Sequence, residues 1–289
     1  MGGMVCVRFR AVVKMTESVP YRTMPASIPA EIIPQLARAR AILDRHLGGA
    51  LQALYLFGSA VDGGLRPQSD IDLLALVGAA PDEPVRRALM LDLLDVSAWP
   101  GTDPACRALE VTVLARDAVL PWRHPARREL QFGEWLRDDL RAGTFEPPME
   151  DHDLAILLTK VRQHSISLLG PPAHELFAPV PPADFAQALA DTIAQWNEPA
   201  DWRDEERHIV LALARIWFSV VTGKIAAKDT AAAWALQRLP VAHRAVLAQA
   251  RDAYLGRAAD ELAARPDQVA AFIHYLKAAI RRAAGSPGA

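Results

Sequence analysis

The spacing of apolar residues in the first part of the chain predicts helices and strands in mixed order. A first helix is expected at 29–46, with its regular part starting near Ile32 or Ile33 because Pro34 is best tolerated in a first turn. Short apolar runs predict buried strands at 53–57, 70–77 and 109–114, and a helix with one apolar face is expected at 83–96.

The second part of the chain shows only helical spacing. Helices are expected at 126–141 and 151–169, before proline-rich punctuation at 171–182. Five further helices are expected beyond it: one around 185–196, then 204–222, 229–239, 241–255 and 266–284. Gly223 is a plausible residue to end the helix expected at 204–222.

These patterns predict an α+β protein with two domains. A mixed sheet with flanking helices is expected in residues 24–180, and an all-α helical bundle in residues 181–289. Residues 1–23 are expected to be an N-terminal extension without a role in the fold, since Met15 and Met24 are both possible start sites.

Composition narrows the classes of function. The chain has 289 residues, of which 51% are hydrophobic, and a formal net charge of −2, so it lacks the strong positive field of a general nucleic-acid-binding protein. Two isolated cysteines make no disulfide framework, and no apolar run reaches the roughly 18 residues needed to span a membrane. A cytoplasmic protein with neither a nucleic-acid nor a membrane partner is therefore expected.

Acidic residues on two predicted strands carry the candidate chemistry. Alternate side chains of a strand share one face, so Asp70 and Asp72 point the same way, with Cα atoms about 6.6 Å apart. Such a pair suits magnesium ions that hold a nucleotide triphosphate. Glu110 is a third carboxylate within an otherwise apolar strand, and it is placed to act as a general base if that strand lies beside Asp72.

Glycine and serine residues next to these strands fit the same chemistry. Gly58 permits close approach of a phosphate, and Ser59 and Ser69 offer hydroxyl and amide donors. The alternative reading is structural: an isolated Asp-x-Asp is usually a solvated strand end, and Glu110 alone could be a surface strand residue. The combination of strand, Gly-Ser, glycine-rich loop and Asp-Ile-Asp favours the nucleotide site.

Five segments of the chain form a recognisable set: LFGSAVDGGLRPQSDIDLL at 56–74, PWR at 121–123, RELQFGEW at 128–135, LLTK at 157–160 and RIWFSVVTGKIAAKD at 215–229. Together they resemble the aminoglycoside adenylyltransferases that modify streptomycin and spectinomycin, which belong to the polymerase-β-like nucleotidyltransferases. The resemblance extends from about residue 30 to residue 280, which is nearly the whole chain. It implies a polymerase-β-like nucleotidyltransferase domain, then a helical domain, with ATP and the drug bound between them.

The resemblance also implies roles for individual residues. Asp70 and Asp72 match the ligands of magnesium, Glu110 matches the catalytic base, and Ser59 and Ser69 match residues near the triphosphate. The residues that match further contacts to ATP are Arg215, Lys228 and Tyr254. The residues that match contacts to the drug are Trp135, Trp196, Asp201, Glu205 and His208.

Each assignment in the helical half has a structural alternative. A buried arginine such as Arg215 is stabilised by a nearby anion, either a bound phosphate or a carboxylate in an internal salt bridge. The acidic residues at 201–206 suit a polycationic drug but also suit a helix N-terminus. The tryptophans and Tyr254 could be core residues, and His208 could be merely solvated. Glu205 departs from the aspartate expected in dual-specificity members, which keeps the charge but lengthens the side chain by one methylene.

The sequence thus predicts an enzyme that transfers AMP from ATP to a hydroxyl of streptomycin or spectinomycin and releases pyrophosphate. The cofactor expected is Mg²⁺, as two ions, with ATP as co-substrate, and a monomer is the working expectation. Two alternatives stay open at this point: a nucleotidyltransferase of the same fold with another acceptor, and a non-catalytic nucleotide-binding module.

Overall fold

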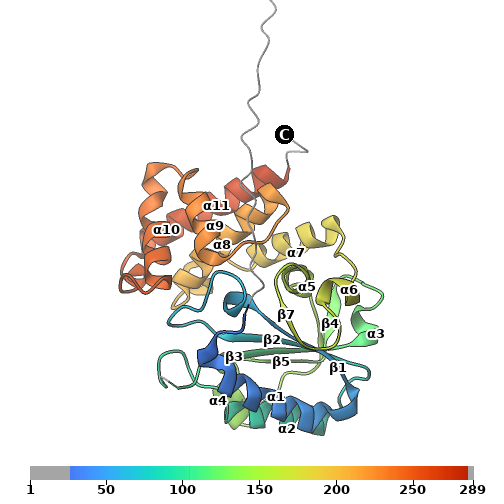
Figure 1. The fold of residues 1–289 in the computed structure, drawn as a ribbon. Coiled ribbons are helices and arrows are strands. Elements are labelled where there is room, and N and C mark those ends of the chain that lie inside the picture. The colour runs from blue at the N-terminus through green and yellow to red at the C-terminus, as the bar shows by residue number, and fades with distance from the viewer. Residues whose placement is uncertain (1–26, 104, 286–289) are drawn as a thin grey trace, which may run out of the picture.

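The computed structural model describes residues 27–103 and 105–285. The extension expected at 1–23 lies outside the described residues. A central mixed sheet occupies the first half of the chain and a group of helices the second half (Figure 1).

The sheet is built around three seven-residue strands: β1 (Leu51–Phe57), β2 (Ile71–Val77) and β3 (Leu109–Ala115). Two short strands, β5 (Leu130–Phe132) and β7 (Ile166–Leu169), complete the order β5-β3-β2-β1-β7. β2 and β3 are parallel, whereas the other three neighbouring pairs are antiparallel. The mixed sheet expected from the sequence is confirmed.

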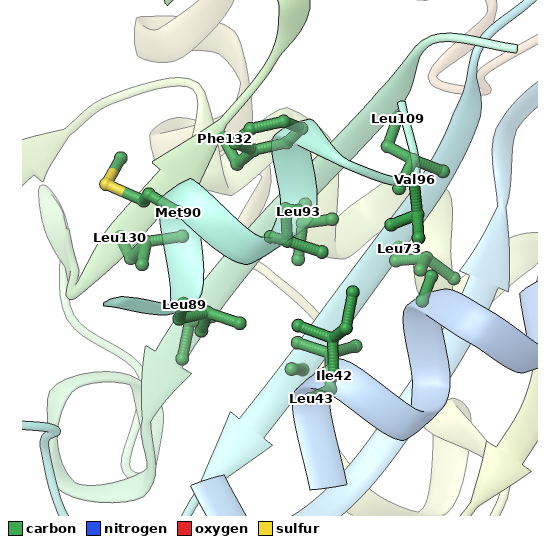
Figure 2. Close-up of a cluster of buried hydrophobic side chains, with 14 of the residues drawn as sticks. Ile42, Leu43, Leu73, Leu89, Met90, Leu93, Val96, Leu109, Leu130 and Phe132 are labelled. Carbon is green, nitrogen blue, oxygen red and sulfur yellow. The ribbon is translucent and has the colours of Figure 1, made fainter. Parts of the chain in front are cut away.

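One face of the sheet packs against α1 (Ile33–Leu47), α2 (Glu83–Leu94) and α4 (Arg137–Arg141). Figure 2 shows how α1 and α2 project Leu43, Leu89 and Leu93 onto this face, toward Leu73 of β2. The start of α2 is fixed by Asp82, whose carboxylate accepts a hydrogen bond of 2.9 Å from the amide of Val85.

The opposite face of the sheet packs against α5 (Leu154–Gln163) and the short helices α3 (Arg116–Val119) and α6 (Ala173–Leu176). A small two-stranded sheet lies here as well, formed by β4 (Ala126–Arg128) and β6 (Met149–Asp151). Both faces are covered, which explains why the central strands read as continuous apolar runs rather than alternating ones.

The helix expected at 126–141 is wrong. β4 and β5 occupy its first half, followed by the 3₁₀ turn Glu134–Leu136 and the short α4. Ala126, Arg128, Leu130 and Phe132 are buried at the two-residue spacing of a strand, and Glu129, in the break between β4 and β5, is buried as well. Pairing of β5 with β3 overrides the helical composition of this segment.

The helix expected at 151–169 is correct only in its first part. α5 ends at Gln163, and the residues from Ile166 to Leu169 form β7 at the edge of the sheet beside β1. A short run of apolar residues is compatible with both an edge strand and a further helical turn. The apolar spacing therefore did not distinguish β7 from a continuation of α5.

The second half of the chain is helical, as expected. Its elements are α7 (Pro182–Ala194), α8 (Glu206–Thr222), α9 (Lys228–Leu236), α10 (Val241–Tyr254) and α11 (Pro266–Ala284). The remaining 3₁₀ turns are Ala30–Ile32, Gly48–Ala50, Gly58–Ala60, Pro199–Asp201 and Leu262–Ala264. α8 packs against α9, α10 and α11, and it ends at Gly223, which adopts the left-handed conformation with φ 68°.

The hydrophobic clusters divide along the chain. The clusters on the two sheet faces end at Phe177, and the cluster of the helical half begins at Leu189. The domain boundary at 180 stays a prediction, and this division supports it. Among the described residues no helix combines the length and the apolar character required to traverse a lipid bilayer.

Candidate active site

Three neighbouring strands place an aromatic ring and two carboxylates in one row. Phe57 of β1 is the register partner of Asp72 on β2, and Asp72 is the register partner of Glu110 on β3. Alternation along the strands puts this row on the face that packs against α5, because Leu74 and Leu114 of the same parity belong to the cluster on that face. Glu110 therefore lies beside Asp72, as the sequence led us to expect.

Gly58 brings the backbone directly against the Asp72 carboxylate. Its φ is +71°, and a Cβ atom at this position would lie 1.7 Å from Oδ2 of Asp72. Only glycine combines this backbone conformation with this close approach. The turn that carries Ser59 thus begins at the carboxylate that we expect to hold the metal.

The charge of Asp72 helps to raise the pKa of both Asp70 and Glu110. Burial, followed by the charge of Asp72, raises the pKa of Asp70 to about 6. Burial and then Asp72 also raise the pKa of Glu110 to about 7. A cation placed among these groups would relieve both the burial cost and the mutual repulsion.

The donor set fits a magnesium ion that is shared with a nucleotide. Asp70 and Asp72 offer oxygen ligands, which Mg²⁺ prefers, and it commonly takes its other ligands from water and substrate phosphates. Among the described residues, no group of three or more His, Cys, Asp or Glu side chains is arranged to hold a metal by itself.

Three cations face these carboxylates from helices. Lys160 projects from α5, Arg215 from α8 and Lys228 from the first residue of α9. Burial lowers the pKa of all three side chains, that of Lys228 to about 8. The Nε atom of Arg215 is buried without a hydrogen-bond partner among the described residues. A bound phosphate would supply the missing acceptor.

The loop between β1 and β2 is tied to the helical half. Arg66 forms a salt bridge of 3.0 Å with Asp229, and its guanidinium carbon lies 6.0 Å from the ring centroid of Tyr254. The Nζ atom of Lys228 lies 5.6 Å from the same centroid. The hydroxyl of Ser69 accepts a hydrogen bond of 2.9 Å from the amide of Arg66, which fixes the turn before Asp70.

His208 and Glu205 lie next to this group. Nε2 of His208 is 3.5 Å from Nζ of Lys228, and Nδ1 is 3.5 Å from Oε2 of Glu205. The nearby Lys228 ammonium is the main cause that lowers the pKa of His208. Both side chains are largely exposed, so they are available to a ligand.

The other three residues expected to contact the drug have different surroundings. Trp135 is 52% exposed and stacks over Gly133. Trp196 packs at the edge of the helical cluster, and Asp201 accepts backbone hydrogen bonds of 2.7 and 2.8 Å from Asn197 and Glu198. Within residues 27–103 and 105–285, no hydrogen bond or ion pair joins these three residues to Asp70 or Asp72.

Sequence reasoning missed Lys160, Arg66 and Asp229 as members of the site. All three occur inside segments that carry the resemblance, but no spacing rule marked them. Arg66 and Asp229 are 163 residues apart in sequence, so only the packing of the two halves reveals the pair.

Comparisons with known proteins agree with this geometry. Residues 36–98 match the nucleotidyltransferase domain model, and residues 175–279 match the C-terminal domain model of aminoglycoside adenylyltransferases. An aminoglycoside (3'') (9) adenylyltransferase of Escherichia coli is 53% identical over 91% of this chain and 100% of its own length. A spectinomycin 9-adenylyltransferase of Staphylococcus aureus is 38% identical over 88% of this chain and 96% of its own length.

A solved structure shares the architecture. It is the spectinomycin adenyltransferase from Enterococcus faecialis with ATP and spectinomycin. The two sequences are 28% identical, the match covers 86% of this chain and 98% of the Enterococcus chain, and the TM-score is 0.80. With two domain models, near-complete coverage and the same fold, the chain belongs to the aminoglycoside adenylyltransferase family and is an enzyme of that nucleotidyltransferase type.

Proposed function

We propose that the protein transfers AMP from ATP to a hydroxyl group of spectinomycin or streptomycin and releases pyrophosphate. The observation that carries the proposal is the register of Glu110 beside Asp72, with Arg215 and Lys228 facing them from the helical half. The relatives supply the drug class: the E. coli protein is an aminoglycoside (3'') (9) adenylyltransferase, and the Enterococcus structure contains ATP and spectinomycin.

In this proposal Asp70 and Asp72 hold magnesium, as two ions, which neutralises phosphate charge. Arg215, Lys228 and Tyr254 bind the nucleotide from the helical half, and Ser59 and Ser69 hold it from the sheet. Glu110 accepts the proton of the drug hydroxyl, whose oxygen then forms a bond to the α-phosphorus while the bond to the pyrophosphate oxygen breaks. Positioning and charge stabilisation supply most of the rate acceleration.

His208, Glu205, Asp201, Trp135 and Trp196 are proposed to contact the drug. The anionic Glu205 suits a polycationic ligand, and its contact with His208 places it next to Lys228. Trp135 offers an exposed ring on which a sugar or cation can stack. The proposal also includes a cytoplasmic location, where ATP is available, and a monomeric state.

Incubation of the protein with ATP, magnesium and each drug tests the reaction by mass spectrometry. We expect spectinomycin or streptomycin to gain the mass of one AMP, with an equal amount of pyrophosphate released. An oligonucleotide offered as acceptor should stay unmodified. If no drug gains this mass while the protein binds ATP, the proposed acceptor class is wrong.

Replacing Glu110 by glutamine tests the catalytic base. We expect nucleotide and drug binding to persist and turnover to fall by roughly 10² or more, because a general base typically contributes this factor. Replacing Asp72 by asparagine is the matched change of a neighbouring carboxylate, and it should instead abolish magnesium-dependent binding of the triphosphate. Unchanged turnover of Glu110→Gln would remove this residue from the role.

A further inference from the structure

The segment 196–205, between α7 and α8, carries three of the residues proposed to contact the drug: Trp196, Asp201 and Glu205. It is an irregular connection that contains one 3₁₀ turn, Pro199–Asp201. The hydrogen-bond ladder of a long helix or a strand therefore does not fix the positions of these three side chains. Their positions depend on the contacts that the segment makes with the helices around it.

Lys277 of α11 holds the first residues of this segment. Its side chain is only 4% exposed, and its ammonium donates hydrogen bonds to the carbonyl oxygen of Trp196 and, at 3.1 Å, to Oδ1 of Asn197. Nδ2 of Asn197 in turn donates to the carbonyl oxygen of Ala194, at the end of α7, over 2.6 Å. Lys277 thus ties α11 to the end of α7 through Trp196 and Asn197.

The same residues hold the Asp201 carboxylate. The backbone amides of Asn197 and Glu198 donate hydrogen bonds of 2.7 and 2.8 Å to Oδ2 of Asp201, whose side chain is exposed. Hydrogen bonds therefore lead from the buried ammonium of Lys277 through Asn197 to an exposed carboxylate. A shift of the backbone at Asn197 moves Asp201 with it.

The other end of the segment is docked by Trp202. Its ring is buried in the cluster of the helical half and lies edge-on to the ring of His274 on α11, with the two centroids 5.9 Å apart. The carbonyl oxygen of Trp202 accepts a hydrogen bond of 3.1 Å from the amide of Glu205. Asp204, inside this turn, has a φ of 68°, which is uncommon for a residue with a Cβ atom. The helix α11 therefore contacts the segment at both ends.

The burial of the Lys277 ammonium is unfavourable for stability. Both of its acceptors are uncharged, and among the described residues it forms no salt bridge, while the charge of Asp201 acts on it from a greater distance. A buried ammonium with neutral acceptors costs free energy of folding relative to an apolar side chain of similar length. An apolar side chain could not, however, donate the two directed hydrogen bonds that select one geometry of the segment.

We infer that Lys277 is a positioning residue for the drug: by holding Trp196 and Asn197 it sets where Trp196 and Asp201 stand, and so determines the affinity for the polycationic acceptor. The inference rests on the function proposed above, in which Trp196 and Asp201 contact the drug. Lys277 itself donates to the chain and does not touch the drug. ATP is expected to be unaffected, because its proposed ligands lie outside this segment.

Two other roles of Lys277 predict different results. If its charge merely lies near the drug site, its removal takes away a repulsion, so a polycationic drug binds as well as before or more tightly. If its role is only to stabilise the fold, its removal lowers the amount of folded enzyme and hence the apparent kcat, while both KM values stay the same. Only the positioning role predicts a rise of the KM for the drug alone.

The first experiment measures the KM for the drug and the KM for ATP with the whole protein, well below the melting temperature of each variant. We expect Lys277→Met to raise the KM for the drug about 10- to 100-fold, the factor that one charge-assisted hydrogen bond contributes, and to leave the KM for ATP unchanged. Lys277→Arg, which keeps the charge and the donors, should recover part of the loss.

Arg281→Met is the matched control. It removes one positive charge from an exposed residue that lies one turn further along α11, and both KM values should stay normal. An unchanged or lowered KM for the drug in Lys277→Met overturns the inference. A rise in the KM for ATP of the same size as the rise for the drug overturns it as well.

The second experiment measures hydrogen–deuterium exchange of the protein without ligands, by mass spectrometry. We expect faster exchange of Lys277→Met in peptides that cover 196–203, where the amides of Asn197 and Glu198 are held by Asp201, and normal exchange in α8. The same exchange in both proteins overturns the inference. If the wild-type protein adenylylates no drug, the proposed function fails, while this experiment still decides whether Lys277 holds the segment.

Asn197→Ala tests the same path without removing a charge. It deletes the Oδ1 acceptor of Lys277 and the bond to Ala194, and because Asn197 is exposed, the variant is expected to fold. It should also raise the KM for the drug and leave the KM for ATP unchanged. If Lys277→Met does not fold, Asn197→Ala and Lys277→Arg decide the matter, and a normal KM for the drug in both overturns the inference.

Discussion

Replacing Gly58 by alanine tests whether the position of the Asp72 carboxylate limits activity. The new Cβ atom would lie 1.7 Å from Oδ2 and 2.5 Å from Cγ of Asp72. A non-bonded carbon and oxygen need about 3.2 Å or more, so the carboxylate or the backbone must move by roughly 1.5 Å; a misplacement of about 1 Å can already cost about 10² in rate. We therefore expect a loss of magnesium-dependent nucleotide binding and of turnover, of about 10² or more.

The backbone contributes a separate penalty, because φ at Gly58 is +71°. A residue with a Cβ atom in this conformation costs about 1–2 kcal/mol. Gly143→Ala is the matched control: φ is +83° and no heavy atom lies within 4 Å of the new Cβ atom. It should lower the thermal stability by a similar amount while turnover stays normal. If Gly58→Ala is as active as Gly143→Ala, the close packing of Gly58 against Asp72 has no catalytic consequence.

Two further predictions concern ion pairs other than the proposed metal ligands themselves. The side chains of Arg66 and Asp229 are only 25% and 21% exposed, and their salt bridge joins the two halves. A double-mutant cycle with Arg66→Met and Asp229→Asn, measured by chemical denaturation, should therefore give a coupling free energy of about 1–3 kcal/mol. A value near zero would show that the contact does not stabilise the fold. Burial is the largest single influence on Glu134 and raises its pKa, but the hydrogen bonds from Arg137 and Ser97, together with the charges of Arg137 and Arg141, outweigh it and leave the pKa lowered. The stability from its ionised form is then present above the ordinary glutamate pKa and lost as the pH falls through the lowered value. Glu134→Gln should therefore flatten the loss of thermal stability below about pH 4.5, whereas exposed Glu83→Gln should leave it unchanged.

The sequence was sufficient for the strands that carry the carboxylates. Asp70-Ile71-Asp72 interrupts an apolar run at alternate positions, and Glu110 is the lone acidic residue in another apolar run, so both the strands and their polar face could be predicted. The register that joins Asp72 to Glu110 followed once the two strands were assumed to be neighbours. These are short-range patterns, in which one strand period determines the direction of the side chains.

The sequence was insufficient wherever tertiary pairing decided the outcome. The residues of β5 have helical composition, and only their hydrogen bonds to β3 make them a strand. The sequence correctly predicted that Lys160 lies on a helix. Which side of α5 approaches the carboxylates becomes clear only when this helix is seen packed across the sheet. Helical periodicity gives the apolar face of a helix, and it does not tell which polar residue at the edge of that face approaches a site.

The division of charge between the two halves gives a physical reason for the two-domain design. The carboxylates Asp70, Asp72 and Glu110 come from the sheet, whereas Arg215 and Lys228 come from helices of the other half. Each set by itself is a group of like charges whose burial is unfavourable, as the raised pKa of Glu110 and the lowered pKa of Lys228 show. In a nucleotide triphosphate with its metal ions, the metal ions pair with the carboxylates and the negative phosphate oxygens pair with the cations. Its binding therefore relieves the repulsion within both sets at once, and because Arg215 and Lys228 come only from the helical half, the complete site requires that the two halves remain packed together.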